Sequence, residues 1–229
     1  MHRQVAKAAE AAEDAADSRG ARKQRTREAL LEAALRLMSE GRGLTSLGLR
    51  EITREAGVVP TSFYRHFRDI DELGLALVEE GGLTLRRLLR EARKTGVPLA
   101  DVLRRSVMIY REYLEQNRLH FMFIAGERHG GSRAIRDAIR SEVRHFTSEM
   151  AADMRHLGFR PELPMETLQL IAGLVVNTML NAATDILDLP PGRSRAEDEM
   201  MENFIRQLRL IFLGALQWQE KSDLPRRKK

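Results

Sequence analysis

Apolar residues recur along this 229-residue chain at intervals of three and four positions, the spacing that places them on one face of a helix. No segment alternates apolar and polar residues as a half-buried strand does. Glycine, proline and asparagine divide the pattern into segments. The segments predict helices over 22–40, 47–56, 60–67, 69–94, 99–116, 118–126, 132–157, 163–187 and 194–220. We therefore predict an all-α fold with about nine helices.

The same segmentation predicts the domains. Residues 1–20 are rich in Ala, Glu and Asp but lack a continuous apolar face, so we expect a disordered arm. Residues 21–68 are expected to form a small domain, and residues 69–221 a larger helical one. The basic residues at 222–229 are expected to form a loose tail.

Residues 47–67 have the spacing of a helix-turn-helix: a short helix, a turn that contains Gly57, and a second short helix. Glycine tolerates the positive φ that such a turn often requires. Ser46 is the expected N-cap of the first helix, and Pro60 suits the first turn of the second. The apolar contacts expected to hold the two helices at a steep angle come from Leu49, Ile52, Ala56, Val58, Phe63 and Phe67.

The second of these helices divides its residues between two faces. At about 100° per residue, Phe63 and Phe67 lie on one face. The opposite face and its flanks contain no acidic residue and carry Thr61, Ser62, Tyr64, Arg65 and Arg68. Hydroxyl and guanidinium donors suit phosphates and base edges, so this face fits a helix lying in the major groove of DNA.

The net charge of +5 lies entirely in this part of the chain. Residues 21–68 hold ten Lys/Arg and five Asp/Glu, whereas the other residues balance at 28 of each. A local excess of positive charge is the expected electrostatic footprint of a protein that binds a polyanion. A solvated charged surface has the same composition, so charge alone leaves both interpretations open.

Individual side chains in this block suggest roles in DNA binding. Arg50 is the best candidate for a bidentate contact with guanine. Contact with phosphates is the role expected of Thr26, Ser46, Tyr64 and His66. Three of the surface residues also have structural alternatives: His66 lies near the core face, Tyr64 can cap the apolar seam, and Arg65 can pair with a carboxylate.

The run from Thr26 to Leu73, and above all its G-V…F-Y-R-H-F…E-L portion, resembles the N-terminal domain of TetR-family transcriptional regulators. The resemblance implies a homodimeric repressor that binds a near-palindromic operator in double-stranded DNA. Carried over by position, the family's DNA contacts fall on Thr26, Arg50, Thr61, Ser62, Tyr64 and His66. Pro60 stands where the family often has a polar residue, and proline offers only apolar contact to a base.

The stretch L-R-E-I-T-R-E-A-G-V-V-P-T-S-F-Y-R-H-F, with the later segments G-E-R and I-R-S-E-V-R-H-F, is similar to the FabR/DesT branch of that family. Regulators of that branch repress genes for unsaturated fatty acid synthesis and respond to long-chain acyl-CoA or acyl carrier protein. The resemblance implies control by a long-chain acyl thioester bound in the C-terminal domain. The alternative is a repressor of an efflux or catabolic operon that responds to another hydrophobic ligand.

Methionine and phenylalanine are frequent in the second half of the chain, and methionine adapts to irregular shapes. They fit either a cavity for a flexible alkyl chain or an ordinary core. The candidate ligand-binding residues are Met108, Met122, Phe123, Arg128, His129, Phe146, Met150, Val175 and Met179. Arg128, His129 and Arg133 are candidates for holding the phosphates of coenzyme A. Alternatively, Glu127 and Arg128 form an ion pair that braces a helix end.

The helices predicted over 163–187 and 194–220 are candidates for a four-helix dimer interface. The first carries apolar residues at Leu168, Ile171, Ala172, Val175, Met179, Ala182, Ala183 and Ile186. The second carries them at Phe204, Leu208, Ile211, Phe212 and Ala215. Asn177 and Asn181 fit either a hydrogen bond across this interface or the lining of the pocket.

Composition and motifs disfavour several other classes of protein. The chain has no cysteine, which excludes disulfides and thiolate metal sites and fits a cytoplasmic protein. It shows no secretory signal and no apolar stretch approaching the length of a membrane helix. The sequence contains no glycine-rich loop for binding phosphates and no pair of histidines four residues apart. We therefore expect no enzyme activity, no cofactor and no metal site. A lipid-binding adaptor would need exposed aromatic residues in the basic block, but Phe63 and Phe67 are expected to point inward.

Overall fold

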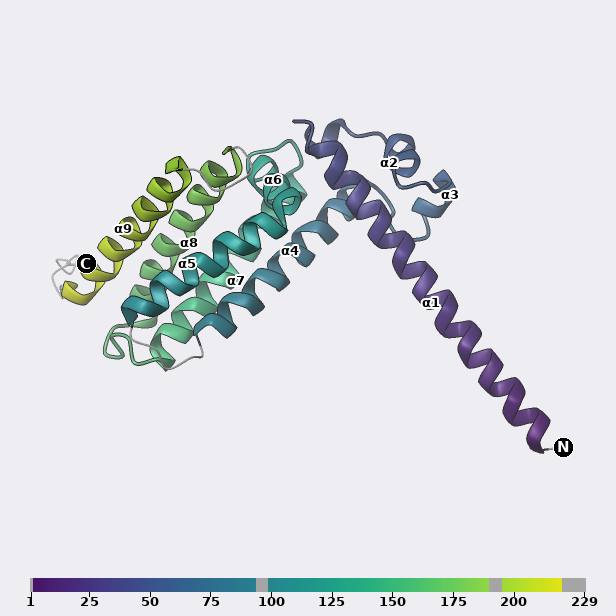
Figure 1. Ribbon diagram of the computed structural model, residues 1–229, viewed down its shortest axis with the longest axis horizontal. Helices are drawn as coiled ribbons and strands as arrows, with labels where there is room; N and C mark the ends of the chain where they lie inside the picture. The colour runs from purple at the N-terminus through teal and green to yellow at the C-terminus, as the bar shows by residue number, and fades with distance from the viewer. Residues whose placement is uncertain (1, 94–98, 190–194, 220–229) are drawn as a thin grey trace, which may run out of the picture. The chain divides into compact units, whose positions relative to one another are not determined.

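The computed structural model describes residues 2–93, 99–189 and 195–219 (Figure 1). These residues form nine α-helices, one short 3₁₀ helix and no strand, so the predicted all-α fold is confirmed. In chain order the helices are α1 (His2–Met38), η1 (Leu44–Ser46), α2 (Leu49–Glu55), α3 (Pro60–Phe63), α4 (Ile70–Arg93), α5 (Leu99–Gln116), α6 (Arg118–Glu127), α7 (Arg133–His156), α8 (Met165–Leu187) and α9 (Arg195–Gln217). The predicted breaks at 95–98 and 190–192 and the basic tail at 222–229 lie outside the described residues.

The N-terminal residues differ from their prediction. Residues 2–20, expected to be a disordered arm, are helical and continuous with the rest of α1. The segment is rich in alanine and glutamate, both strong helix formers, and it contains no proline. Intrinsic helix propensity therefore supports a helix here even without the apolar face whose absence suggested disorder.

Two predicted details of the helix-turn-helix are wrong. Ser46 ends η1 instead of capping α2, and its hydroxyl donates to the carbonyl oxygen of Gly43 at 2.7 Å. Leu47 is buried in an extended conformation, so α2 begins only after Gly48, its N-cap. α3 ends after four residues, and the chain continues to Phe67 in hydrogen-bonded turns.

The chain folds as two compact units, each with its own core. The first comprises the residues up to Leu77 and the segment Gly126–Arg136. The second comprises Val78–Ala125 and the residues from Asp137 onward. This grouping differs from the predicted boundary after residue 68, because part of α4 and a segment distant in the sequence belong to the first unit.

Close packing around Gly74 accounts for that difference. An added Cβ atom at Gly74 would lie 2.4 Å from the Leu44 side chain and 2.7 Å from that of Ile135. Leu44, Ile135 and the neighbouring Leu73 are all fully buried. The first turns of α4 and the start of α7 therefore complete the core of the first unit.

The second unit is a helical bundle in which α5, α8 and α9 pack against one another (Figure 1). α8 contributes eleven buried side chains to its core.

α8 is also long and apolar enough to cross a membrane by length and composition, contrary to our expectation that no stretch approaches that length. However, 50% of the relevant window is buried inside the unit, and the core helix of a soluble protein meets the same criteria. The finding is therefore weak support for a membrane segment. The prediction failed because scattered Asn, Gln and Thr interrupt the apolar run without adding charge.

Candidate DNA-binding surface and ligand cavities

α2 and α3 are joined by a sharp turn whose backbone requires glycine. Gly57 has a φ of +68°, in the left-handed region that glycine enters without steric cost. Thr53, one turn earlier, is buried, and its hydroxyl donates to the carbonyl oxygen of Leu49 at 3.0 Å. The buried hydroxyl is thus satisfied within its own helix, and the two helices pack as the predicted helix-turn-helix.

The aromatic residues after this turn divide between core and surface as predicted. Phe63 and Phe67 are 0% and 3% exposed, and their ring centroids lie 5.6 Å apart. Tyr64 is 65% exposed although its ring meets Phe63 edge to face. Thr61 and Arg65 are also exposed. A polar surface therefore covers a phenylalanine core.

Two arginines on this unit have the exposure that contact with a polyanion requires. Arg50 and Arg65 are exposed, and neither guanidinium group forms an ion pair or hydrogen bond with any residue in the described ranges. The alternative role of Arg65 in pairing with a carboxylate therefore does not hold for this part of the chain. Ser62 is half-buried.

Carboxylates of the same unit are occupied by other arginines. Arg36 pairs with Glu55 at 2.9 Å. Arg42 binds Glu51 through both carboxylate oxygens and holds the pKa of that carboxyl below its usual range. These pairs neutralise acidic groups locally, so they do not compete for Arg50.

The other predicted phosphate contacts are more constrained. Thr26 is half-buried, and its hydroxyl donates to the carbonyl oxygen of Arg22 at 3.0 Å. Ser46 is exposed, but its hydroxyl donates within its own turn. Burial, followed by nearby cationic side chains, lowers the pKa of His66. At neutral pH His66 is therefore a neutral imidazole, which can donate one hydrogen bond to a phosphate.

The second unit contains a cavity of about 280 Å³, here called the larger cavity. It lies between α5, α7, α8 and α9 and reaches the turn after α7. Its lining consists of Leu103, Ser106, Val107, Tyr110, Met150, Met154, Leu157, Gly158, Phe159, Val175, Met179, Phe204, Leu208 and Phe212. Phe159 and Phe212 meet edge to face with ring centroids 5.6 Å apart. Ser106 and Tyr110 supply the only polar side-chain groups in this lining.

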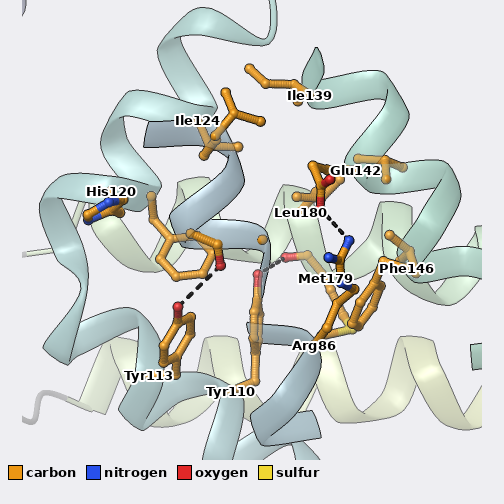
Figure 2. Close-up of a pocket in the computed structure, with 16 residues that line it drawn as sticks. Arg86, Tyr110, Tyr113, His120, Ile124, Ile139, Glu142, Phe146, Met179 and Leu180 are labelled. Atoms are coloured by element: carbon orange, nitrogen blue, oxygen red, sulfur yellow. Dashed lines mark hydrogen bonds and ion pairs between the residues drawn. The ribbon is translucent and has the colours of Figure 1, made fainter. Parts of the chain in front are cut away.

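A smaller cavity of about 80 Å³ lies between α4, α5, α6, α7 and α8 (Figure 2). Its lining consists of Val78, Gly81, Gly82, Arg86, Tyr110, Tyr113, His120, Phe121, Ile124, Ile139, Glu142, Val143, Phe146, Val176, Met179 and Leu180. The Tyr113 hydroxyl donates to the Gly81 carbonyl oxygen at 3.3 Å, and the Tyr110 hydroxyl donates to that of Met179 at 3.0 Å.

The smaller cavity carries charge that is already balanced. Arg86 forms an ion pair with Glu142, and its Nε lies 3.8 Å from a carboxylate oxygen of Glu149. Burial lowers the pKa of His120, and its Nε2 has no hydrogen-bond partner among the described residues. An anionic ligand group would have to displace a glutamate from Arg86, so the cavity suits neutral groups better.

Two segments of the sequence match models of a known protein family. Residues 30–77 match the family described as bacterial regulatory proteins, tetR family. Residues 99–207 match the tetracyclin repressor-like C-terminal domain. The two matches together cover more than half of the chain. The chain belongs to the TetR family of transcriptional regulators.

Solved structures show that the TetR fold extends over most of the chain. The fatty acid degradation regulator FadR from Bacillus halodurans has a TM-score of 0.62 at 13% identity, over 85% of this chain and 96% of that one. A TetR-like regulator from a Rhodococcus species has a TM-score of 0.62 at 19% identity, over 85% and 97%. A TetR-family regulator from Syntrophomonas wolfei has a TM-score of 0.69 at 16% identity, over 83% and 96%. Because the sequence identities are below 20%, these similarities show only that the fold is shared.

In this TetR protein, four of the predicted ligand residues line the cavities. Phe146 lines the smaller cavity, and Met150 and Val175 line the larger one. Met179 lines both. They lie on α7 and α8.

The other predicted ligand residues line neither cavity. Met108 is 37% exposed on α5, and Met122 packs against the core from its edge. Phe123 is buried, but it lies two positions after Phe121 on α6 and therefore points to nearly the opposite side. The remaining two predicted residues, Arg128 and His129, belong to the first unit. Helical faces alone could not show which apolar stripe borders empty space.

The preceding residue, Glu127, also belongs to the first unit and is 3% exposed. Its Oε1 accepts a hydrogen bond from the backbone N–H of Leu44 at 2.7 Å. The carboxylate therefore supports the first unit through η1.

The cavity residues with polar groups that were not predicted include Arg86, Tyr110, His120 and Glu142. Tyr110 lies on the apolar face of a predicted helix, which is the one signal the sequence offers for it. The other three are ordinary polar residues of amphipathic helices, so only the packing of separate helices brings them together.

TetR regulators dimerise. Our prediction of which α8 residues form the dimer interface is wrong. All eight of them are buried in the core of their own unit. The exposed apolar residues are instead Leu170 and Leu174 on α8, and Leu210, Leu213 and Leu216 on α9. Asn177 and Asn181 are exposed on α8 and line neither cavity. A helix that is apolar on most sides does not reveal by its pattern which side faces a partner.

Proposed function

We propose that this TetR-family protein represses genes for fatty acid desaturation or unsaturated fatty acid synthesis, and that a long-chain acyl-CoA controls its binding to DNA. The observation that supports this most is the larger cavity, whose lining is apolar except for Ser106 and Tyr110. Burial of an alkyl chain in such a cavity is favourable by about 0.8 kcal/mol for each methylene removed from water. Methionines at 150, 154 and 179 suit a flexible chain.

The larger cavity also suggests where the thioester lies. Leu157 lines it and is nonetheless 57% exposed, so the turn after α7 connects the cavity with solvent. The polar, anionic coenzyme A would remain outside at this turn, because the only arginine in the lining of either cavity, Arg86, is occupied by Glu142. The acyl chain would then extend inward from Leu157 toward Tyr110.

The DNA-binding half of the proposal uses the exposed face of the first unit. A dimer would present two copies of this face, and successive major grooves are about 34 Å apart, so the operator should be a near-palindrome. Arg50 is the proposed contact to guanine, and Thr61, Ser62 and Tyr64 are proposed to fix the register on the backbone. The described role of the Bacillus halodurans protein in fatty acid degradation makes acyl thioesters the first ligands to test.

The test is a fluorescence anisotropy titration of the protein into DNA from upstream of fatty acid genes, at fixed salt. Saturated and cis-unsaturated long-chain acyl-CoA are each added. We expect nanomolar, salt-sensitive binding that shifts differently with the two chains. Val175→Phe, which fills the larger cavity, should keep DNA binding and lose the response. Leu83→Phe adds a phenyl ring at an exposed leucine on α4 that lines neither cavity, and it should keep both.

The outcomes separate the two halves of the proposal. Specific DNA binding that ignores both ligands would remove acyl-CoA and favour an efflux or catabolic operon with another hydrophobic effector. No specific binding to these promoters, with or without ligand, would remove the fatty acid assignment. Because a ligand shifts DNA affinity only by its preference for one conformation, the sign of the shift is itself a result of the titration.

A further inference from the structure

The two cavities of the second unit follow one another along the same helices. On α7, Phe146 lines the smaller cavity, and Met150, one turn later, lines the larger one. On α5 the order is reversed, with Tyr113 at the smaller cavity and Val107 at the larger. Opposite orders on two helices are expected when those helices run antiparallel beside one lengthwise space.

Tyr110 separates the two cavities. It is one of two residues that line both, the other being Met179, and its hydroxyl donates to the carbonyl oxygen of Met179 at 3.0 Å. Figure 2 shows the ring standing at the edge of the smaller cavity with this hydrogen bond in place. The side chain is 1% exposed, so it cannot turn outward to solvent without disrupting the core. The ring and the hydrogen bond therefore lie at the boundary that the two cavities share.

We propose that the two cavities are successive compartments of one acyl-chain site, and that Tyr110 is the partition that determines the chain length the protein prefers. This inference rests on the proposed function, because it takes an acyl chain as the ligand. A chain short enough for the larger cavity binds with the partition closed. A longer chain reaches the smaller cavity only after the Tyr110 ring turns aside and its hydrogen bond to Met179 breaks.

The physical reason for a length preference is the cost of opening the partition. Each methylene buried in the larger cavity raises affinity about fourfold. Methylenes beyond the partition gain the same burial only if the Tyr110 hydroxyl loses its partner in a dry environment, which is unfavourable. Affinity should therefore rise with chain length and then stop rising at the length that reaches Tyr110.

The measurement is calorimetric binding of octanoyl-, dodecanoyl-, hexadecanoyl- and octadecanoyl-CoA to the full chain, below the micelle concentration. Wild type should show a break at which affinity stops rising. Tyr110→Leu removes both the ring and the hydroxyl, so the break should move to longer chains, with at least a tenfold gain for the first chain beyond the wild-type break. Phe212→Leu, which enlarges only the larger cavity, should not extend affinity into the smaller one and serves as the control.

A second variant keeps the idea testable if Tyr110→Leu does not fold. Val176→Phe fills the smaller cavity alone and leaves Tyr110 in place. It should therefore leave the affinity for chains below the break unchanged and weaken only the binding of longer chains. A break at the same length in Tyr110→Leu, or a wild-type series without a break, overturns the partition. Failure of wild type to bind any acyl-CoA overturns the proposed function itself, which is a separate result.

Discussion

The backbone N–H of Leu44 donates a 2.7 Å hydrogen bond to the carboxylate of Glu127, 83 positions further along the chain. Both residues are buried in the first unit, and the second carboxylate oxygen of Glu127 has no hydrogen-bond partner in the described part of the chain. Gly130 lies so close that an added Cβ would be 2.2 Å from that oxygen. The last residue of α6 is thereby tied to η1, next to the helix-turn-helix in sequence.

Removal of the Glu127 carboxylate should weaken the first unit. Glu127→Ala leaves the buried N–H of Leu44 without an acceptor, which should cost about 1–3 kcal/mol of unfolding free energy. Hydrogen exchange of the Leu44 amide, followed by NMR, should accelerate accordingly. Glu127→Gln retains an acceptor oxygen and should lose clearly less protection. Equal exchange in all three proteins would show that the hydrogen bond does not stabilise the unit.

Gly74 should not tolerate a methyl group. Gly74→Ala places Cβ against the fully buried Leu44 and Ile135 side chains, so we expect a loss of about 1–3 kcal/mol from overpacking. Gly126→Ala is the matched control, because that helical glycine has no neighbouring atom within 4 Å of an added Cβ. It should be neutral or stabilising by up to about 1 kcal/mol. Urea unfolding of both variants measures the contrast, and equal effects would contradict it.

Arg50 should matter for DNA affinity and not for stability. Arg50→Ala removes an exposed side chain that has no partner in the described ranges, so the midpoint of thermal unfolding should stay within a few degrees of wild type. DNA affinity should fall by about 1–3 kcal/mol, and discrimination at one base pair should relax. Anisotropy titrations against operators substituted at each position test this. A uniform loss at every position would assign Arg50 to phosphate instead.

Stability should depend on the protonation of His120. Its pKa in the folded protein lies below the ordinary value of 6.5 because of burial, so folding favours the neutral imidazole. The contribution of neutral His120 to the unfolding free energy is fully present above the ordinary pKa of 6.5. It is lost as the pH falls toward the lower pKa of the folded state. Wild type should therefore lose more unfolding free energy than His120→Gln between about pH 7.5 and about pH 5. Parallel curves for the two proteins would refute this assignment.

The exposed leucines of α8 and α9 should hold the dimer together. Leu213→Glu places a charge on the exposed face of α9, so sedimentation velocity should show a shift from dimer to monomer at micromolar concentration. The fold should persist, because the side chain is 60% exposed in the described unit. Leu83→Glu, at an exposed leucine on α4, should leave the dimer intact. A dimer that survives Leu213→Glu would place the interface elsewhere.

Local sequence determined the helices and the helix-turn-helix of this protein. Spacing at three and four residues, with Gly and Pro between segments, placed α5 to α9 within a few residues of their observed ends. Phe63 and Phe67 were correctly expected inside, and Gly57 was correctly expected at a positive φ. These features depend on neighbours within about one helical turn, so their causes are all visible in the sequence.

Only the tertiary structure decided which apolar residues face each other and which border empty space. Val175 and Val176 are adjacent in the sequence, yet one lines the larger cavity and the other the smaller. α8 is apolar on most of its surface, and its packing against α5 and α9 left Leu170 and Leu174 exposed instead of the stripe expected at the interface. A cavity is the volume that several helices fail to fill together, so no periodicity within one helix can specify it.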